Sequence, residues 1–279
     1  MELELKRGGR TARVETLGGE LVSYRDERGL EYIWGGDPAY WPGRNPLLFP
    51  IVGMLKEGKI RFDGREYAME RHGFARRREF TPAARGEDWV RLELRESAET
   101  LALYPYPFRL AVEQRLTDTG FSTAVTVANP GEGPLPFCLG AHTGFRCPLE
   151  AGERFEDYEL VFPERESCPT LLLRDGLLDR PAALPCLEDT DTLPLDYRWF
   201  DALDTLIFEG LRSRSVALRS RKSGRGVRVS FDGFPMLAFW TMPGKKAPYL
   251  CIEPWHGCAA GTAEGPEFTD KAHCIVLAP

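Results

Sequence analysis

The chain has 279 residues, of which 43% are hydrophobic and 28% are charged, and its formal net charge is −6. The acidic balance and the mixing of both charge signs argue against a nucleic-acid-binding surface. No stretch approaches the roughly 20 apolar residues that a membrane-spanning helix needs, so we expect no membrane contact. All-β proteins of this length commonly form one unit, and we expect a single domain over residues 1–279.

The first elements along the chain are strands. Residues 1–6 alternate apolar and charged side chains, which predicts a first strand and not a signal peptide. Residues 89–94 alternate in the same way. The best candidate for a helix is short: Ser97 can cap a helix over residues 98–103, before two prolines end it.

Two pairs of alternating segments predict β-hairpins. Residues 108–113 and 123–127 lie on either side of the turn residues 118–120. Residues 216–218 and 227–231 are joined by the turn 223–226. Between these hairpins, residues 165–198 are rich in proline and aspartate, and we expect a loop excursion there. The chain as a whole is predicted to be all-β, with few short helices.

The cysteines do not indicate a metal site. There are seven, an odd number, and none forms a Cys-x-x-Cys pair, so a zinc site is not expected. With no secretory signal in the sequence, they are best interpreted as buried or free thiols of a reducing cytoplasm. We therefore expect a cytoplasmic protein without a metal or other cofactor.

Two titratable residues lie in unusually apolar or small-residue surroundings. Glu253 is part of Ile-Glu-Pro-Trp-His-Gly, and His142 is part of Gly-Ala-His-Thr-Gly-Phe. Burying a carboxylate costs several kcal/mol unless it has a partner or a function. A carboxylate and an imidazole that meet in one pocket can move protons on a neutral substrate. A structural salt bridge for Glu253 and a hydrogen-bonded core position for His142 remain the alternative interpretations.

Two further polar residues are candidates for ligand contacts. His72 opens His-Gly-Phe-Ala-Arg, where the glycine lets the backbone approach a ligand closely, although a polar residue at a strand start is also possible. Asp204 precedes an apolar run and can equally cap a turn. The tryptophans are expected mainly in the core, although an aromatic face beside a pocket is the usual platform for a sugar ring.

Taken together, these motifs resemble the aldose 1-epimerase (galactose mutarotase) family, in particular its bacterial branch with the His-Gly-Phe-Ala-Arg motif. The matching segments occur in the family's order: 45–53, 58–60, 62–64, 72–76, 140–145, 204–208 and 252–255. The resemblance implies a large antiparallel β-sandwich that binds a sugar in a cleft on one face. It also implies a reaction without a metal or redox cofactor.

The resemblance assigns roles to individual residues. Glu253 is implied as the catalytic base that takes the proton of the anomeric hydroxyl, and His142 as the general acid that protonates the ring oxygen. His72 and Asp204 are implied to hold the sugar, and we add Arg76 and Trp255 as substrate-binding candidates. We expect the functional atoms of Glu253 and His142 to lie on opposite sides of a pyranose C1–O5 edge. Their separation is then its width plus two hydrogen bonds of about 2.6–3.2 Å, with neither group fully enclosed.

Two departures from the family pattern affect these expectations. Met54 stands where the family usually has an arginine that reaches the sugar, which predicts weak activity unless Arg44 or Lys56 compensates. If position 54 faces the sugar, Met54→Arg is expected to raise kcat/KM. The chain also stops at Pro279, where the family normally continues through a turn and a last strand, which leaves either a shortened sandwich or an open edge.

The sequence leaves three functions open. The first is an aldose 1-epimerase acting on a free hexose or a close relative. The second is a hexose-6-phosphate 1-epimerase, in which the basic run 76–78 receives the phosphate. The third is a sugar-binding or sensing protein without turnover. The expected partner is a small-molecule sugar, and the chain is expected to be a monomer or a homodimer.

Overall fold

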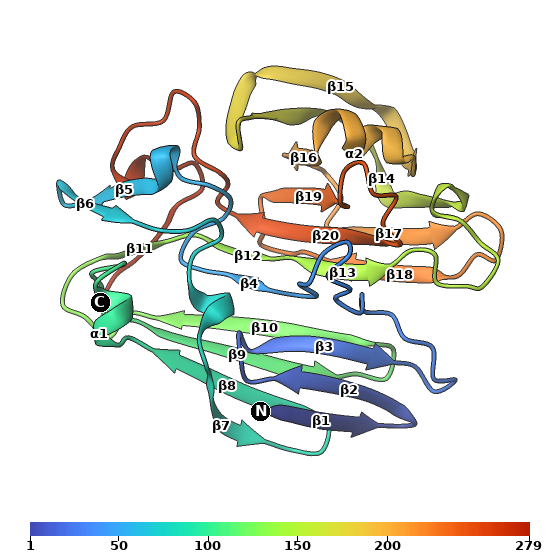
Figure 1. Cartoon of the computed structure of the whole chain (residues 1–279), viewed down its shortest axis with the longest axis horizontal. Coiled ribbons are helices and arrows are strands. Elements are labelled where there is room, and N and C mark those ends of the chain that lie inside the picture. The colour runs from blue at the N-terminus through green and yellow to red at the C-terminus, as the bar shows by residue number, and fades with distance from the viewer.

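The protein is built mainly from antiparallel strands, as the computed structural model of residues 1–279 shows (Figure 1). The predicted all-β class is thereby confirmed. The sheets curl around one continuous apolar core of 60 buried residues drawn from all parts of the chain. No helix is long and apolar enough to cross a membrane.

The largest sheet has ten strands and carries most of the C-terminal half of the chain. Its main path is β18 (Gly226–Ser230), β17 (Ser215–Ser220), β14 (Tyr158–Arg174), β16 (Thr205–Glu209), β19 (Met236–Trp240), β20 (Tyr249–His256), β12 (Leu139–Ala141) and β4 (Leu47–Leu48). Two strands branch from this path: β13 (Thr143–Arg146) pairs with β20, and β15 (Leu177–Pro194) pairs with β14. β20 is the most deeply buried of these strands, with seven consecutive buried residues.

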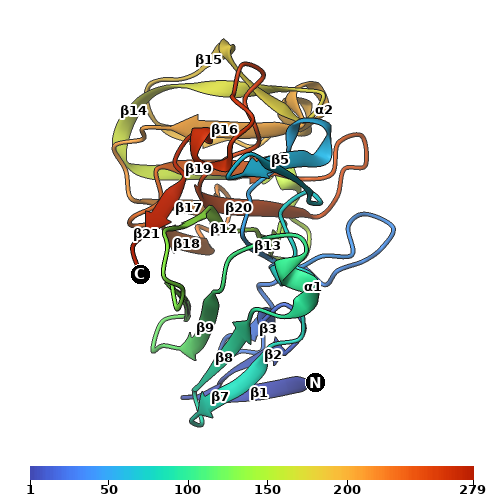
Figure 2. The ribbon, with the colours of Figure 1, turned by 90° about the vertical axis from the view of Figure 1, so that its left-hand side faces the viewer.

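Smaller sheets come mainly from the N-terminal half. One has three strands, β1 (Glu2–Arg7), β2 (Arg10–Glu15) and β3 (Glu20–Arg25), and another has four, β10 (Phe121–Ala128), β9 (Arg109–Leu116), β8 (Trp89–Arg95) and β7 (Thr81–Arg85). Both lie below the large sheet in Figures 1 and 2. Two-stranded sheets are formed by β5 (Lys59–Phe62) with β6 (Arg65–Ala68), and by β11 (Leu135–Phe137) with β21 (Ile275–Leu277). β21, the last strand, therefore pairs with β11 of the same chain.

Both predicted hairpins and the predicted first strand are confirmed. β9 pairs with β10, and β17 pairs with β18, each in antiparallel register. In β8 the residues Val90, Leu92 and Leu94 alternate into the core, because successive side chains of a strand point to opposite faces.

Helices are few and short. The predicted helix is α1 (Ala98–Leu101), and Ser97 and Thr100 form a capping box at its start. A second helix, α2 (Tyr197–Leu203), was not predicted; Asp196 caps it by accepting a hydrogen bond from the backbone N–H of Arg198. Four 3₁₀ turns complete the list: η1 (Lys56–Gly58), η2 (Ala75–Arg77), η3 (Phe155–Asp157) and η4 (Phe268–Asp270).

The expected loop excursion over residues 165–198 is wrong. This region belongs mostly to the long hairpin of β14 and β15, which is the upper layer in Figure 1. Four register shifts interrupt the hairpin, and such bulges hide the two-residue period on which a strand prediction depends. Apart from one parallel bridge between Leu178 and Gly261, β15 pairs only with β14, and an edge strand tolerates its prolines.

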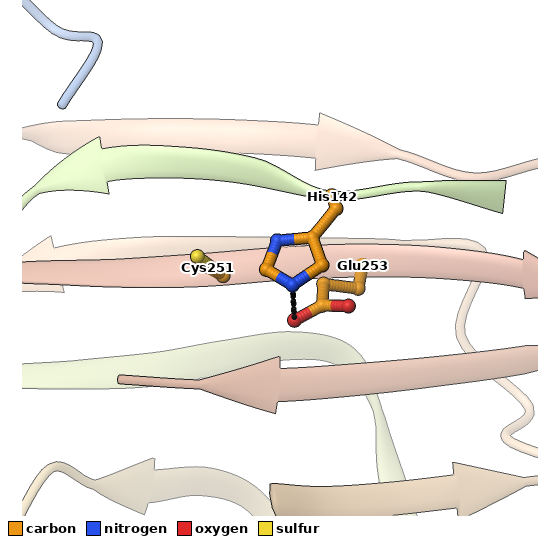
Figure 3. Close-up of side chains that lie close together, drawn as sticks. All are labelled: His142, Cys251 and Glu253. Carbon is orange, nitrogen blue, oxygen red and sulfur yellow. Dashed lines mark ion pairs between the residues drawn. The ribbon is translucent and has the colours of Figure 1, made fainter. Parts of the chain in front are cut away.

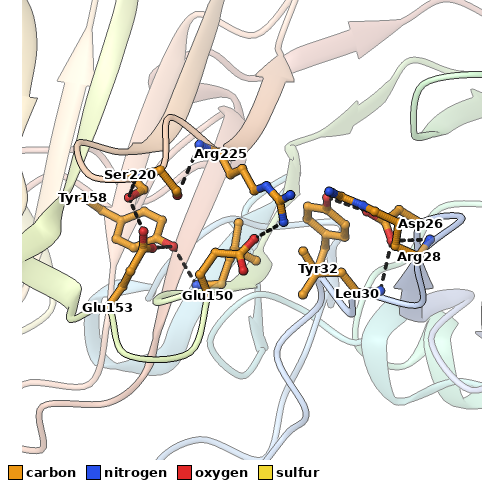
Figure 4. Close-up of polar contacts among 11 residues, drawn as sticks. Asp26, Arg28, Leu30, Tyr32, Glu150, Glu153, Tyr158, Ser220 and Arg225 are labelled. Atoms are coloured by element: carbon orange, nitrogen blue, oxygen red, sulfur yellow. Dashed lines mark hydrogen bonds and ion pairs between the residues drawn. The ribbon is translucent and has the colours of Figure 1, made fainter.

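Two carboxylates, the buried Asp26 and the half-buried Glu153, hold chain segments between strands (Figure 4). Asp26 accepts hydrogen bonds from the backbone N–H groups of Arg28 and Leu30, each at 3.0 Å, and from the Tyr32 hydroxyl at 3.1 Å. Glu153 accepts hydrogen bonds from the hydroxyls of Tyr158 and Ser220. These bonds satisfy polar groups that would be costly to leave unpaired.

Candidate active site

His142 and Glu253 face each other across neighbouring strands of the large sheet. β12 and β13 both pair with β20, with Gly140 opposite Trp255 and Thr143 opposite Ile252. His142 lies in the one-residue break between β12 and β13, and the same register places it opposite Glu253. The two side chains meet: His142 Nε2 lies 3.2 Å from Glu253 Oε1 (Figure 3).

Burial controls the protonation of this pair. The side chains are only 10% and 2% exposed. Desolvation raises the pKa of Glu253 well above its ordinary value of 4.5, and the nearby charge of Asp204 adds to the rise. Desolvation also lowers the pKa of His142 to about 3, with a smaller contribution from the charges of Arg76 and Arg71. Both shifts favour the uncharged forms, a protonated carboxyl group and a neutral imidazole.

The expected separation of the two groups is not observed. They are in direct contact, and Glu253 is almost fully enclosed. A buried carboxyl group needs a hydrogen-bond partner, and the strand register supplies His142. A sugar edge can lie between them only if the two side chains move apart.

His72 joins this cluster from a different part of the chain. Its ring centroid lies 5.6 Å from that of His142, with the rings perpendicular. The Gly53 N–H donates to His72 Nδ1 at 3.1 Å, and the His72 N–H donates to the Gly53 carbonyl at 2.9 Å. Because Nδ1 accepts, the neutral ring carries its proton on Nε2. Burial, followed by the neighbouring charges, lowers the pKa of His72 well below its ordinary value.

Aromatic rings surround His142. The Trp41 ring lies against it at 4.9 Å, and Trp240 meets it edge-on at 5.6 Å. Both tryptophans are half-buried, so they offer partly exposed faces beside the acid–base pair. The sequence did not single out these two tryptophans as functional residues. The place of Trp240 beside the site follows from the fold, because Trp240 in β19 lies opposite Cys251 in β20.

The remaining predicted residues lie at the same cluster in different settings. Asp204 is exposed and lies at the end of α2, where its φ of 63° is positive. The Thr205 hydroxyl donates a hydrogen bond to the Asp204 carboxylate at 2.8 Å. Arg76 is half-buried in η2, and its Nη2 donates to the Arg71 carbonyl at 2.9 Å. Trp255 is buried in the core, and its indole N–H offsets part of the rise in the pKa of Glu253, although its geometry falls short of a full hydrogen bond.

One set of donors at this site can hold a metal ion. The ligand atoms of His142, Cys251 and Glu253 lie within 4.8 Å of one another (Figure 3). Cys251 and Glu253 are two residues apart on β20 and therefore point to the same side of the sheet. Desolvation raises the pKa of the Cys251 thiol well above its ordinary value, which opposes the loss of the thiol proton that metal binding requires.

Two surface hollows, of about 550 and about 250 Å³, lie elsewhere. The larger is lined by residues within the segment 78–100, and the smaller is lined by residues around Lys56 and Gly261. Neither contains the His142–Glu253 pair. The titratable cluster, and neither of these two hollows, is therefore the candidate active site.

The pKa shifts predict how stability changes with pH. A raised pKa of Glu253 in the folded state means that stability is lost as pH rises above about 4.5, because the unfolded chain ionises first. Glutamine at this position cannot ionise. The melting temperatures of Glu253→Gln and the wild type are therefore expected to be similar at pH 4. Toward pH 8, the melting temperature of the variant should increasingly exceed that of the wild type. Calorimetry at several pH values checks this, and a difference that does not change with pH would contradict it.

Comparison with known proteins identifies the family of the chain. The family model for aldose 1-epimerase matches residues 1–269. The chain is 41% identical to the plasmid-encoded protein LacX of Lactococcus lactis over 287 aligned positions, covering 100% of this chain and 95% of LacX.

Solved structures show the same fold. A galactose mutarotase related enzyme from Lactobacillus acidophilus superposes with a TM-score of 0.95 at 28% identity, covering 100% of this chain and 93% of that one. A galactose mutarotase-like protein from Lactobacillus casei gives 0.93 at 27% identity, with 100% and 95% covered. These matches support the interconversion of sugar anomers by an isomerase. The chain belongs to the aldose 1-epimerase family.

Proposed function

We propose that the protein interconverts the α and β anomers of a hexose or a related sugar, with Glu253 as the base and His142 as the acid. The observation that carries this proposal is the buried contact of 3.2 Å between the two side chains. A carboxyl group and an imidazole that share one proton are suited to a reaction in which one proton leaves the sugar and another arrives.

The proton inventory of the reaction matches the pair. Moving the shared proton from Glu253 to His142 Nε2 gives a carboxylate and an imidazolium without exchange with solvent. The carboxylate then takes the proton from the anomeric hydroxyl, and the imidazolium protonates the ring oxygen as the C1–O5 bond breaks and the C1 carbonyl forms. Rotation about C1–C2 and reversal of both transfers give the other anomer and restore the pair.

The surrounding residues are proposed to hold the sugar. Trp41 and Trp240 present half-buried aromatic faces beside His142, and an apolar sugar face packs well on such rings. Neutral His72 offers Nε2–H as a donor, and Arg76 offers its guanidinium. Asp204 lies close enough to Glu253 to affect its pKa and can accept hydrogen bonds from sugar hydroxyls. Trp255 is proposed to act through Glu253.

A second candidate is a sugar phosphate as the substrate. Arg77 and Arg78 form ion pairs with Glu70 and Glu99, whereas Arg71 and Arg76 have no carboxylate partner. Two such guanidinium groups beside uncharged histidines favour an anionic substituent.

The seven free cysteines support a reducing compartment, and we propose the cytoplasm. We also propose that the chain acts as a monomer or a homodimer.

Two-dimensional exchange NMR separates these candidates. With wild-type protein, we expect cross-peaks between the anomers to grow faster than in buffer for glucose, galactose or glucose 6-phosphate. Acceleration of the phosphate alone assigns the second candidate. Binding of these sugars without acceleration of any would instead identify a sugar-binding protein without turnover.

A further inference from the structure

Arg71 is a cation at the active-site cluster that none of the predicted roles includes. Its Nη2 donates a hydrogen bond to Met54 Sδ at 2.8 Å, and this is its one side-chain hydrogen bond. The side chain is exposed and makes no ion pair. Met54 follows Gly53, whose N–H donates to His72 Nδ1, and the His72 ring lies 5.6 Å from that of His142, so the Arg71–Met54 contact adjoins the acid–base pair. The charge of Arg71 also contributes to lowering the pKa of both histidines.

The backbone holds Arg71 beside Met54. His72 and Gly53 exchange two hydrogen bonds, one through the His72 ring and one between backbone groups. These bonds fix the segment that contains Met54 against the segment that contains Arg71. The Arg76 guanidinium also donates to the Arg71 carbonyl, so the position of Arg71 is set from two sides.

The tip of the β14–β15 hairpin lies next to the contact between Met54 and Arg71. Gly176 has φ 79°, a conformation that favours glycine. A Cβ atom at Gly176 would lie 2.5 Å from Met54 Sδ and 3.4 Å from Arg71 Nη2. The absence of a side chain at the tip therefore leaves room for the thioether and the guanidinium together.

The thioether is a weak acceptor for a group with five N–H donors. A sugar oxygen is a stronger acceptor and can take the guanidinium from Met54 at little cost. Arg44, which the sequence suggested as a substitute, instead pairs with Glu15 and donates to the Gly35 carbonyl.

We propose that Arg71 binds the substrate directly by donating to a sugar or sugar-phosphate oxygen, and that Met54 holds it ready for this contact. This rests on the proposed function in that the ligand is a sugar. It changes the expectation for Met54→Arg: a second guanidinium beside Arg71 adds like-charge repulsion, so this variant alone is expected to bind sugar more weakly than the wild type.

The test compares sugar binding by Arg71→Met, Met54→Arg and the exchanged double variant Met54→Arg/Arg71→Met. Arg65→Met is the matched control, because Arg65 is an exposed arginine in β6 without an ion pair. Dissociation constants for glucose and for glucose 6-phosphate are measured by titration with tryptophan fluorescence, and anomer exchange is measured on the same samples. Melting temperatures confirm that each variant is folded.

Loss of a hydrogen bond from a charged donor is expected to raise the dissociation constant in Arg71→Met about tenfold to a hundredfold. The anomer exchange rate at saturation should change much less, because a contact made throughout the reaction affects binding and not turnover. The exchanged variant should recover most of the affinity, and Arg65→Met should match the wild type. A loss confined to glucose 6-phosphate assigns the contact to the phosphate.

Unchanged affinity of Arg71→Met for both sugars would overturn the role of Arg71 and leave the proposed function intact. Failure of the wild type to accelerate exchange, with Arg71→Met still weakening binding, would overturn the function and leave the contact intact. Binding of neither sugar by the wild type would overturn both.

Discussion

Replacement of Glu253 by glutamine is expected to slow enzyme-catalysed anomer exchange by about 10²–10⁴-fold. Glutamine keeps the size of the protonated side chain and can donate its N–H to His142 Nε2, so the fold and the contact persist. It cannot accept the anomeric proton, however. Exchange NMR at saturating sugar measures the loss, and the affinity for the sugar should change little.

Glu209→Gln provides the matched control for this variant. Glu209 pairs with His273, which makes a second carboxylate–histidine contact outside the active-site cluster. Its loss should leave exchange near the wild-type rate. Near-normal exchange in a folded Glu253→Gln protein would remove Glu253 from the mechanism.

Replacement of His142 by glutamine is expected to produce a loss of similar size, about 10²–10⁴-fold in the rate at saturation. The amide can still hydrogen-bond to Glu253 but cannot take up and release a proton. It also loses the ring contact with Trp41, so some increase in KM is expected as well. His273→Gln is the control. If the exchange rate of His142→Gln lies within threefold of the rate of His273→Gln, the imidazole of His142 is not the acid.

Much of the fold followed from short-range patterns. Alternation predicted β8 and the two hairpins because each has one face toward the core and a simple turn. The β14–β15 hairpin could not be predicted in this way, because its strands carry bulges and prolines. Helix α2 follows an aspartate cap but is only seven residues long, too short for a clear helical period.

The candidate site could be predicted only in part. Glu253 and His142 were singled out by their local surroundings, but their direct contact depends on the register of β12 and β13 against β20, a strand far along the chain. The approach of Arg71 to Met54 depends on the paired hydrogen bonds between His72 and Gly53. Neither segment carries a local signal of that contact, so sequence reasoning looked for a substitute at Arg44 and Lys56 instead.

The most direct test of the central claim measures anomer exchange in Glu253→Gln, His142→Gln and the double variant in one series with the wild type. If the two side chains act as one unit on a shared proton, the double variant should lose no more activity than the worse single variant. If the losses multiply, so that the double variant falls by the product of the two single effects, the groups act independently and the account of a shared proton is contradicted.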